Sequence, residues 1–221
     1  MEGIRLWLFD IDGTLVDTGG AGMRALKEAA IECFGGEGPE LDLAGSTDSG
    51  IVLNMCEHFG VPHGEEGVEH FYAFYLERLE WNLAHGGFGG RVLPGVVELL
   101  DRLATDDTAA VGLLTGNIAD GAAVKMQHYG LDHHFEFGAY GCDFADRNLL
   151  GPVALERAAN HLGREFSPQE TLVIGDTPKD ISCAHAMGAK CLAVATGRFS
   201  ADELKAAGAD FVLPGLNELE H

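Results

Sequence analysis

Pairs of carboxylates occur at two places in the sequence where an apolar run ends. Asp10 and Asp12 stand two residues apart directly after the first run, and Asp176 and Asp180 stand four residues apart after a later one. Like charges this close repel one another unless a cation or a shared proton offsets them. Because no cysteine or histidine cluster competes, oxygen ligands from Asp10, Asp12 and Asp176 predict a Mg²⁺ site.

A third polar cluster follows another apolar run. Thr115, Gly116 and Asn117 come after residues 109–114 and precede a predicted helix. A hydroxyl, an amide and unpaired backbone N–H groups at a helix N-terminus can hold an anion such as phosphate. Each cluster taken singly also fits an ordinary helix cap. Three such clusters after successive runs favour one site, in which a hard cation faces an anion.

The clusters need a sheet to bring them together, and the chain alternates short apolar runs with amphipathic stretches. We predict strands over 4–9, 109–114, 171–174, 191–194 and 211–213, and helices over 95–104, 119–129, 152–162, 179–187 and 201–207. This alternation is typical of an α/β fold with a doubly wound parallel sheet covered on both faces. Ligand sites in such sheets lie beyond the carboxyl ends of the strands, where the three clusters fall.

Residues 17–91 interrupt the alternation, because their pattern is helical and shows no convincing strand. The predicted helices there cover 21–34, 49–59 and 65–83. We therefore predict an all-helical cap domain over 17–91, inserted into a core domain formed by 1–16 and 92–218, with 219–221 as a tag remnant. The four glycines within 86–90 suit a mobile return connection.

Two motifs in the cap have alternative interpretations. Residues 45–48, Gly-Ser-Thr-Asp, open the second cap helix, either as an ordinary N-cap or as a loop that reaches the active site. The aromatic residues Phe71, Tyr72, Phe74 and Tyr75 are interpreted as the packing face of the third cap helix rather than as a substrate box.

Composition limits the classes of partner. Against 14 Lys+Arg the chain has 35 Asp+Glu, which gives a net charge of −21. Nucleic acids and anionic membranes require basic patches, so neither is expected as a partner. Apolar runs fall far short of the roughly 18 to 20 residues of a spanning helix, no signal peptide is evident, and the five cysteines form no paired motif. These features predict a cytoplasmic protein.

With the acidic motif at 10–14, Thr115 after a strand, and Gly175-Asp176 followed by Asp180, the chain resembles the haloacid dehalogenase (HAD) superfamily of phosphotransferases. The resemblance covers nearly the whole chain and is greatest to the phosphoglycolate phosphatase-like branch. It implies a Rossmann-like core with a cap that opens about hinges near 17–20 and 86–90. It also implies a Mg²⁺-dependent phosphatase for a small phosphorylated metabolite, with phosphoglycolate as the first substrate to test.

The resemblance assigns roles to the acids. Asp10 matches the nucleophile that forms an aspartyl-phosphate, and Asp12 matches the general acid that then acts as a base. Mg²⁺ would be held by the side chain of Asp10, the backbone carbonyl of Asp12 and the carboxylate of Asp176, with Asp180 supporting the metal or its waters.

Binding of the transferred phosphate falls, by the same resemblance, to the second and third motifs. Thr115 and the backbone of Gly116 would bind it, with Asn117 assisting. The third motif departs from the usual lysine followed by proline, so we assign its role to Arg147, which lies before a predicted helix and can bind in a forked geometry. The competing candidate is Lys125, in the middle of the predicted helix over 119–129.

Two other functions share these markers. A phosphomutase of the β-phosphoglucomutase type forms the same aspartyl-phosphate and returns it to a sugar. A non-catalytic phosphate-binding module would have lost a catalytic residue, whereas Asp10, Asp12 and Asp176 are all present. A dehalogenase is disfavoured, because those relatives lack an acid at the position of Asp12.

Overall fold

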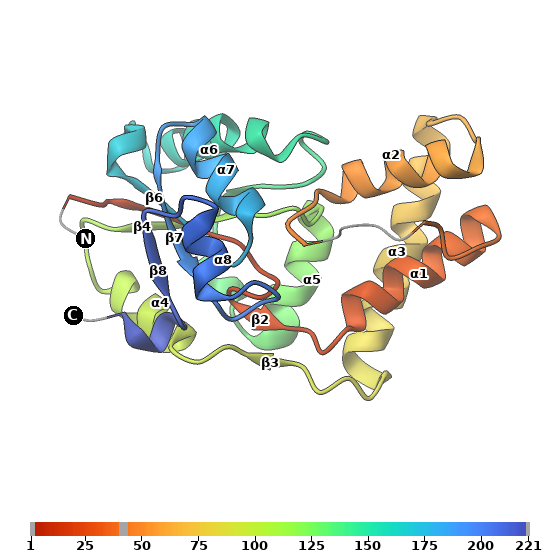
Figure 1. The fold of residues 1–221 in the computed structure, drawn as a ribbon, viewed down its shortest axis with the longest axis horizontal. Helices are drawn as coiled ribbons and strands as arrows, with labels where there is room; N and C mark the ends of the chain where they lie inside the picture. The colour runs from red at the N-terminus through yellow and green to blue at the C-terminus, as the bar shows by residue number, and fades with distance from the viewer. Residues whose placement is uncertain (1–2, 40–43, 220–221) are drawn as a thin grey trace.

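The computed structural model describes residues 3–39 and 44–219 (Figure 1). Its strands are β1 (Leu6–Phe9), β2 (Val16–Asp17), β3 (Arg91–Val92), β4 (Ala110–Leu114), β5 (Gly138–Ala139), β6 (Thr171–Gly175), β7 (Lys190–Val194) and β8 (Phe211–Leu213). Its α-helices are α1 (Ala21–Phe34), α2 (Asp48–Phe59), α3 (Glu65–His85), α4 (Val96–Ala104), α5 (Ala119–Tyr129), α6 (Leu150–Leu162), α7 (Pro178–Ala186) and α8 (Ala201–Ala206). Short 3₁₀ turns cover Asp132–His134, Arg147–Leu149, Pro168–Glu170 and Leu216–Glu218.

Six strands form one parallel sheet in the order β5-β4-β1-β6-β7-β8. Because β1 lies between β4 and β6, Phe9 at its end pairs with Leu113 on one side and Ile174 on the other. The residues that follow these three strands therefore emerge side by side at one edge of the sheet. The predicted α/β parallel fold is confirmed.

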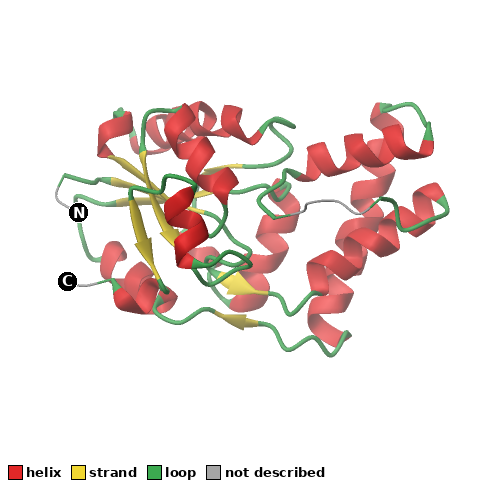
Figure 2. Ribbon diagram, in the orientation of Figure 1, coloured by secondary structure: helices red, strands yellow, loops and turns green. Residues whose placement is uncertain are grey.

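Helices cover both faces of the sheet (Figure 2), and alternate residues of β1 point to opposite faces. Trp7 and Phe9 pack with the apolar residues of α4 and α5 in one buried cluster. Leu6 and Leu8 pack with those of α6, α7 and α8 in another. A strand buried on both sides is continuously apolar, and for this reason it appears in the sequence as an uninterrupted apolar run.

The helices α1, α2 and α3 pack together on one side of the sheet (Figure 1) and share a buried cluster of their own. Ala25, Ile51 and Phe71 represent the three helices in this cluster, and Ile118, which directly precedes α5, joins it. The helical unit therefore rests on the N-terminal end of α5. Its predicted boundaries at 17 and 91 stay a prediction.

Three short strands, β2, β3 and β5, were not predicted from the sequence pattern. Val16–Asp17 pairs with Arg91–Val92 as a short antiparallel ladder where the chain enters and leaves the helical unit, although no strand was predicted there. Gly138–Ala139 adds a sixth strand to the five that were predicted. Two residues are too few to display a period-2 pattern, so tertiary pairing alone defines these strands.

Predicted helix limits agree with the structure to within two residues, and α6 starts two residues before its predicted position at 152. Of the predicted tag remnant, residues 220–221 lie outside the described part of the chain, whereas Leu219 is partly buried against the core. No helix within residues 3–39 and 44–219 combines the length and apolar character needed to cross a bilayer.

Candidate active site

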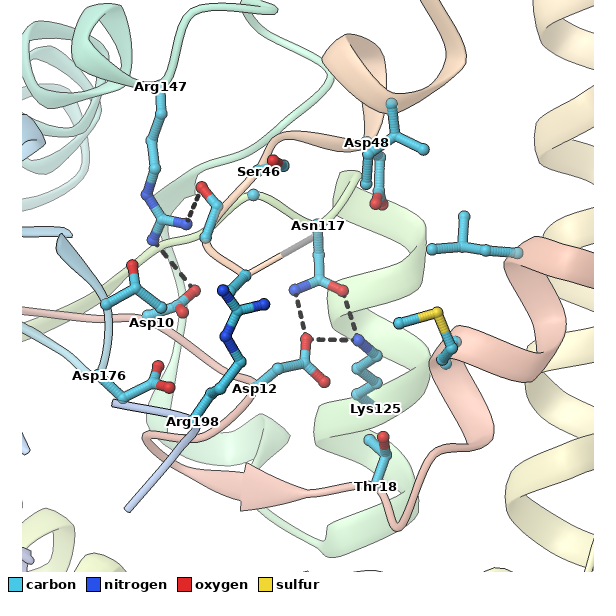
Figure 3. A pocket seen from close by; sticks show the side chains of 18 of the residues that line it. Asp10, Asp12, Thr18, Ser46, Asp48, Asn117, Lys125, Arg147, Asp176 and Arg198 are labelled. Atoms are coloured by element: carbon cyan, nitrogen blue, oxygen red, sulfur yellow. Dashed lines mark hydrogen bonds and ion pairs between the residues drawn. The ribbon is translucent and has the colours of Figure 1, made fainter. Parts of the chain in front are cut away.

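Three carboxylates meet at the carboxyl edge of the sheet, and Figure 3 shows two of them, Asp10 and Asp176. Asp10 follows β1 and its backbone N–H donates to the carbonyl of Ile174 at 2.9 Å, which fixes it beside β6. Asp176 follows β6, and Asp180 lies in the first turn of α7. All three are buried, and carboxylate oxygens of the three lie within 4.8 Å of one another. The parallel topology therefore brings the first and the last acidic motif into one cluster.

The turn after Asp12 is built so that Asp176 can approach it. Gly13 has φ 81, a left-handed conformation that L side chains rarely adopt. A Cβ at this position would lie 2.4 Å from Oδ2 of Asp176, closer than any real Cβ contact. The chain then closes a short turn, in which the N–H of Gly13 donates to the carbonyl of Val16 at 2.8 Å.

Arg147 enters the same cluster from the 3₁₀ turn that precedes α6. Its Nη2 lies 3.2 Å from Oδ1 of Asp10 and also donates to Oδ1 of Asp180, and its Nη1 donates to the carbonyl of Gly45 at 2.9 Å. The guanidinium is buried, and its Nε has no hydrogen-bond partner among the described residues. The guanidinium therefore keeps one N–H group, on Nε, that makes no hydrogen bond to a described residue.

The electrostatics of the cluster are those of negative charges held together out of water. Burial raises the pKa of Asp10, and Asp180 raises it further, while the Arg147 guanidinium lowers it. Burial also raises the pKa of Asp176, and the nearby Asp180 and Asp10 act in the same direction. One guanidinium does not neutralise three carboxylates. The cluster is therefore a candidate metal site made only of oxygen donors.

Asp12 belongs to a second network, beside the first. Its Oδ2 accepts from Nδ2 of Asn117 at 2.9 Å and from the ammonium of Lys125 at 2.6 Å (Figure 3). Lys125 also donates to Oδ1 of Asn117 at 2.6 Å and is buried. The Asp12 side chain itself is 44% exposed. A half-exposed carboxylate with one oxygen held by two donors is well placed to exchange a proton through the other.

The predicted phosphate-binding residues lie between the two networks. The Thr115 hydroxyl is buried, accepts from Nδ2 of Asn117 at 2.9 Å and bonds the carboxyl of Asp10.

The carboxylate of Asp180 accepts from the N–H of Thr177 at 2.9 Å and from its hydroxyl at 2.7 Å. Asp180 is therefore the N3 residue of the capping box that opens α7, with Thr177 as the N-cap, as well as a partner of Arg147.

The loop that opens α2 docks onto the core. The N–H of Asp48 donates to the carbonyl of Gly116 at 2.7 Å, and Oδ2 of Asp48 accepts from the N–H of Ile118 at 2.9 Å. Thr47 caps α2 and donates from its hydroxyl to the carbonyl of Ala145 at 2.6 Å. Both interpretations of residues 45–48 therefore hold, since one segment is a helix cap and also reaches the site.

A cavity of about 340 Å³ lies between the core and the cap helices. Core residues in its lining are Asp10, Asp12, Gly116, Asn117, Lys125, Arg147, Asp176, Thr177 and Arg198, and cap residues are Thr18, Gly20, Gly22, Met23, Leu26, Ala44, Gly45, Ser46, Asp48, Ile51 and Tyr75. This volume suits a small molecule.

Every residue predicted for the site is thus in or directly behind one cavity. Asn117 contacts Asp12, although it was expected to assist phosphate binding. Both candidates for the third motif reach the site: Arg147 contacts Asp10, whereas Lys125 contacts Asp12. Asp48 and Arg198 also line the cavity, although neither was predicted as an individual site residue. For Asp48, its position in the 45–48 motif was the available signal in the sequence, and no pattern indicated Arg198.

Comparisons with known proteins agree with this geometry. Residues 7–194 match the family described as haloacid dehalogenase-like hydrolase. The chain belongs to this family. It is a hydrolase whose acidic motifs and parallel sheet are those that the sequence resemblance implied.

Individual relatives of this haloacid dehalogenase-like hydrolase are distant. It is 27% identical to Phosphoglycolate phosphatase 1 of Pseudomonas aeruginosa, over 87% of this chain and 70% of the relative. It is also 27% identical to Pyrophosphatase PpaX of Halalkalibacterium halodurans, over 98% and 95% of the two chains. The crystal structure of CbbY from Rhodobacter sphaeroides in complex with phosphate shares the fold, with a TM-score of 0.76, 18% identity and coverage of 98% and 96%.

Proposed function

We propose that this chain is a Mg²⁺-dependent phosphatase that hydrolyses small phosphomonoesters through an aspartyl-phosphate on Asp10. The observation that carries the proposal is the placement of Asp10 between two different networks. On one side lie Asp176, Asp180 and Arg147, and on the other lies Asp12 with its two donors. Nucleophile, charge compensation and proton donor are then available to one substrate in one cavity.

The residues present fit Mg²⁺. The donor set contains only carboxylate oxygens, and the pKa values of Asp10 and Asp176 are raised first by burial and then by neighbouring carboxylates, both of which a divalent cation would offset. Asp10 and Asp176 would hold the ion together with the backbone carbonyl of Asp12, and Asp180 would support it. When bound, Mg²⁺ supplies charge neutralisation for the phosphoryl group and the attacking carboxylate.

In the first step, an oxygen of Asp10 attacks phosphorus and forms the O–P bond, while the bond from phosphorus to the ester oxygen breaks. Asp12 gives a proton to that leaving oxygen, which departs as an alcohol. Arg147, whose Nη2 already contacts Asp10, holds the nucleophile in line and places its positive charge beside the phosphoryl group. Thr115 and the backbone of Gly116 bind the same group.

In the second step, water attacks the phosphorus of the aspartyl-phosphate and Asp12 removes its proton. The bond from Asp10 to phosphorus breaks, inorganic phosphate leaves, and both carboxyl groups return to their starting states. The paired contacts of Lys125 and Asn117 with Oδ2 of Asp12 orient this carboxylate for both proton transfers. The docked loop at 45–48 limits the entry of bulk water until the cap opens.

The test is phosphate release from p-nitrophenyl phosphate with Mg²⁺ and after EDTA treatment. Asp10→Asn is expected to lower kcat at least about a thousandfold, since the nucleophile is lost. A phosphoryl adduct on Asp10 should be found by mass spectrometry after an acid quench of the wild-type reaction. Asp107→Asn, an exposed position in the turn between α4 and β4, is the matched control and should keep wild-type turnover.

Wild-type turnover in Asp10→Asn, or full activity after removal of divalent cations, would contradict the proposal. Circular dichroism and the Tm of each variant separate a chemical loss from a folding defect. Isomerisation of a hexose 1-phosphate without release of free phosphate would assign the same site to a phosphomutase.

A further inference from the structure

The leaving group of any substrate must lie against the cap. Asp12 protonates the leaving oxygen in the proposed function, and its partner Lys125 abuts α1, because a Cβ at Gly22 would lie 3.5 Å from Nζ of Lys125. Beyond the ester oxygen, the substrate therefore extends from the reacting carboxylates toward the first turns of α1 and the start of α2.

The cap wall that faces this region is mainly apolar, with Thr18, Ser46 and Asp48 as its polar side chains. Met23 and Leu26 come from α1, Ile51 from α2 and Tyr75 from α3, and all four line the cavity. Leu26, Ile51 and Tyr75 are also part of the buried cap cluster, so their positions are fixed by packing. The wall is a built surface, and its apolar side chains can bury apolar atoms of a ligand.

Among the residues that the structure describes, no lysine or arginine of the cap lines this region. The four lysine and arginine residues of the cap are ion-paired: Arg24 and Arg78 with Glu28, at 2.7 and 2.8 Å, and Lys27 and Arg91 with Glu37 and Asp17, at 2.8 and 3.7 Å. None of the four lines the cavity. Residues 40–43, which the structure does not describe, contain no lysine or arginine in the sequence.

The cations that do line the cavity come from the core. Lys125 is bonded to Asp12 and Arg147 to Asp10. Arg198 follows Gly197, which lies so close to Asp176 that a Cβ on it would meet Oδ2 at 1.7 Å. The charges of Lys125 and Arg147 are therefore compensated by the reacting carboxylates, and Arg198 emerges from the loop beside Asp176.

Among the described residues of the cap, a carboxylate is the one charged group that lines the cavity. Asp48 lines it and is buried, and its Oδ2 is held by the N–H of Ile118. An anionic leaving group would meet this like charge and the apolar wall, where it would lose water without gaining a counter-charge.

We propose that the cavity selects phosphomonoesters whose alcohol part is uncharged and at least partly apolar, and disfavours those that carry a carboxylate next to the phosphate ester. This inference rests on the proposed phosphatase function. Relatives named for phosphoglycolate are 27% or less identical to this chain, which leaves room for a different set of cap side chains.

The experiment compares kcat/KM for three small esters with Mg²⁺ present. Phosphoglycolate carries a carboxylate, 2-hydroxyethyl phosphate has a neutral hydroxymethyl group in its place, and propyl phosphate has an ethyl group there. We expect phosphoglycolate to be the poorest substrate by about tenfold or more, and propyl phosphate to be the best. A preference for phosphoglycolate would overturn the inference while leaving the phosphatase function intact. Absence of turnover with all three esters and with p-nitrophenyl phosphate would instead refute the phosphatase function, and the inference with it.

A cation placed on the wall should reverse the discrimination. Met23 is 45% exposed, so Met23→Lys places an ammonium beside the ligand cavity without leaving a void in the core or overpacking it. We expect it to raise the ratio of kcat/KM for phosphoglycolate to that for propyl phosphate about tenfold. Ile31→Lys is the matched control, because Ile31 lies on the same helix, is 49% exposed and is not in the lining. An equal ratio in both variants would contradict the inference.

Arg198→Ala tests the alternative source of selectivity. If Arg198 serves the phosphoryl group, its loss lowers kcat/KM for phosphoglycolate and propyl phosphate by the same factor. A selective loss for phosphoglycolate would show that Arg198 holds a carboxylate on the leaving group, and this would overturn the inference.

Discussion

Asp48 joins the cap to the core through a buried carboxylate, and replacing it with asparagine should stabilise the protein. Its Oδ2 accepts from the N–H of Ile118, a bond that an amide oxygen can also accept. The second group of the asparagine amide would face the cavity, which Asp48 lines. Asp48→Asn therefore removes the charge while keeping the size and the hydrogen bond.

The magnitude follows from the pKa of Asp48. Burial raises it from 3.8 to about 6, against the opposing effects of the Ile118 N–H and the Lys125 ammonium, while Asp12 adds to the increase. A carboxyl whose pKa is higher in the folded state loses stability as pH rises through the interval from about 4 to about 6. Above that interval the ionised form costs about 3 kcal/mol, and at pH 4.5 about 1 kcal/mol.

The assay is urea unfolding of wild type and Asp48→Asn at pH 7.5 and pH 4.5. The variant should be more stable by up to about 3 kcal/mol at pH 7.5, with the advantage falling to about 1 kcal/mol at pH 4.5. In thermal unfolding each kcal/mol corresponds to about 2 to 4 °C for a chain of this size. Asp107→Asn, at an exposed turn position, should show no such pH-dependent gain. A variant less stable than wild type at pH 7.5, or an advantage equal at both pH values, would refute the reasoning.

Three further predictions concern the site. Arg147→Ala should lower kcat for p-nitrophenyl phosphate by about a hundredfold or more, because Arg147 contacts the nucleophile. Lys125→Ala should affect propyl phosphate more than p-nitrophenyl phosphate, since it orients the acid that a poor leaving group requires; turnover lost in Lys125→Ala and nearly normal in Arg147→Ala would overturn the assignment of the third motif. Gly116→Ala should lower kcat/KM about tenfold or more, because its Cβ would lie 2.0 Å from the carbonyl oxygen of Ser46 and block docking of the loop. Gly67→Ala, where a Cβ meets nothing within 4 Å, is its control, and equal kinetics in the two variants would contradict the docking role.

Part of the site could be predicted because it depends on two local signals. A strand buried on both faces is an uninterrupted apolar run, and the residue after it emerges at the carboxyl edge of a parallel sheet. Asp10, Thr115 and Asp176 each satisfy both conditions. The sheet order then places β1 between β4 and β6, so these residues converge.

Other contacts depend on packing between segments that are distant in sequence. Lys125 stands in the middle of α5, and only the orientation of that helix turns its ammonium toward Asp12. The sequence positions of Lys125 and Asp12 do not indicate that their side chains meet. A lysine in the middle of a helix could equally lie on the surface. The role of Arg147 could be predicted more readily from the sequence, because this residue lies just before a helix in the alternation of strands and helices.

The sequence by itself determined the fold class, the helical insertion pattern and the acidic residues at the strand ends, because each depends on local periodicity and on the residue that ends a strand. Tertiary structure decided which cation faces which acid, how Asp48 docks at the start of α5, and that the cap wall facing the cavity is mainly apolar. These features depend on how the buried cluster of α1, α2 and α3 rests on the core through Ile118, and packing between distant segments leaves no periodic signal in the sequence.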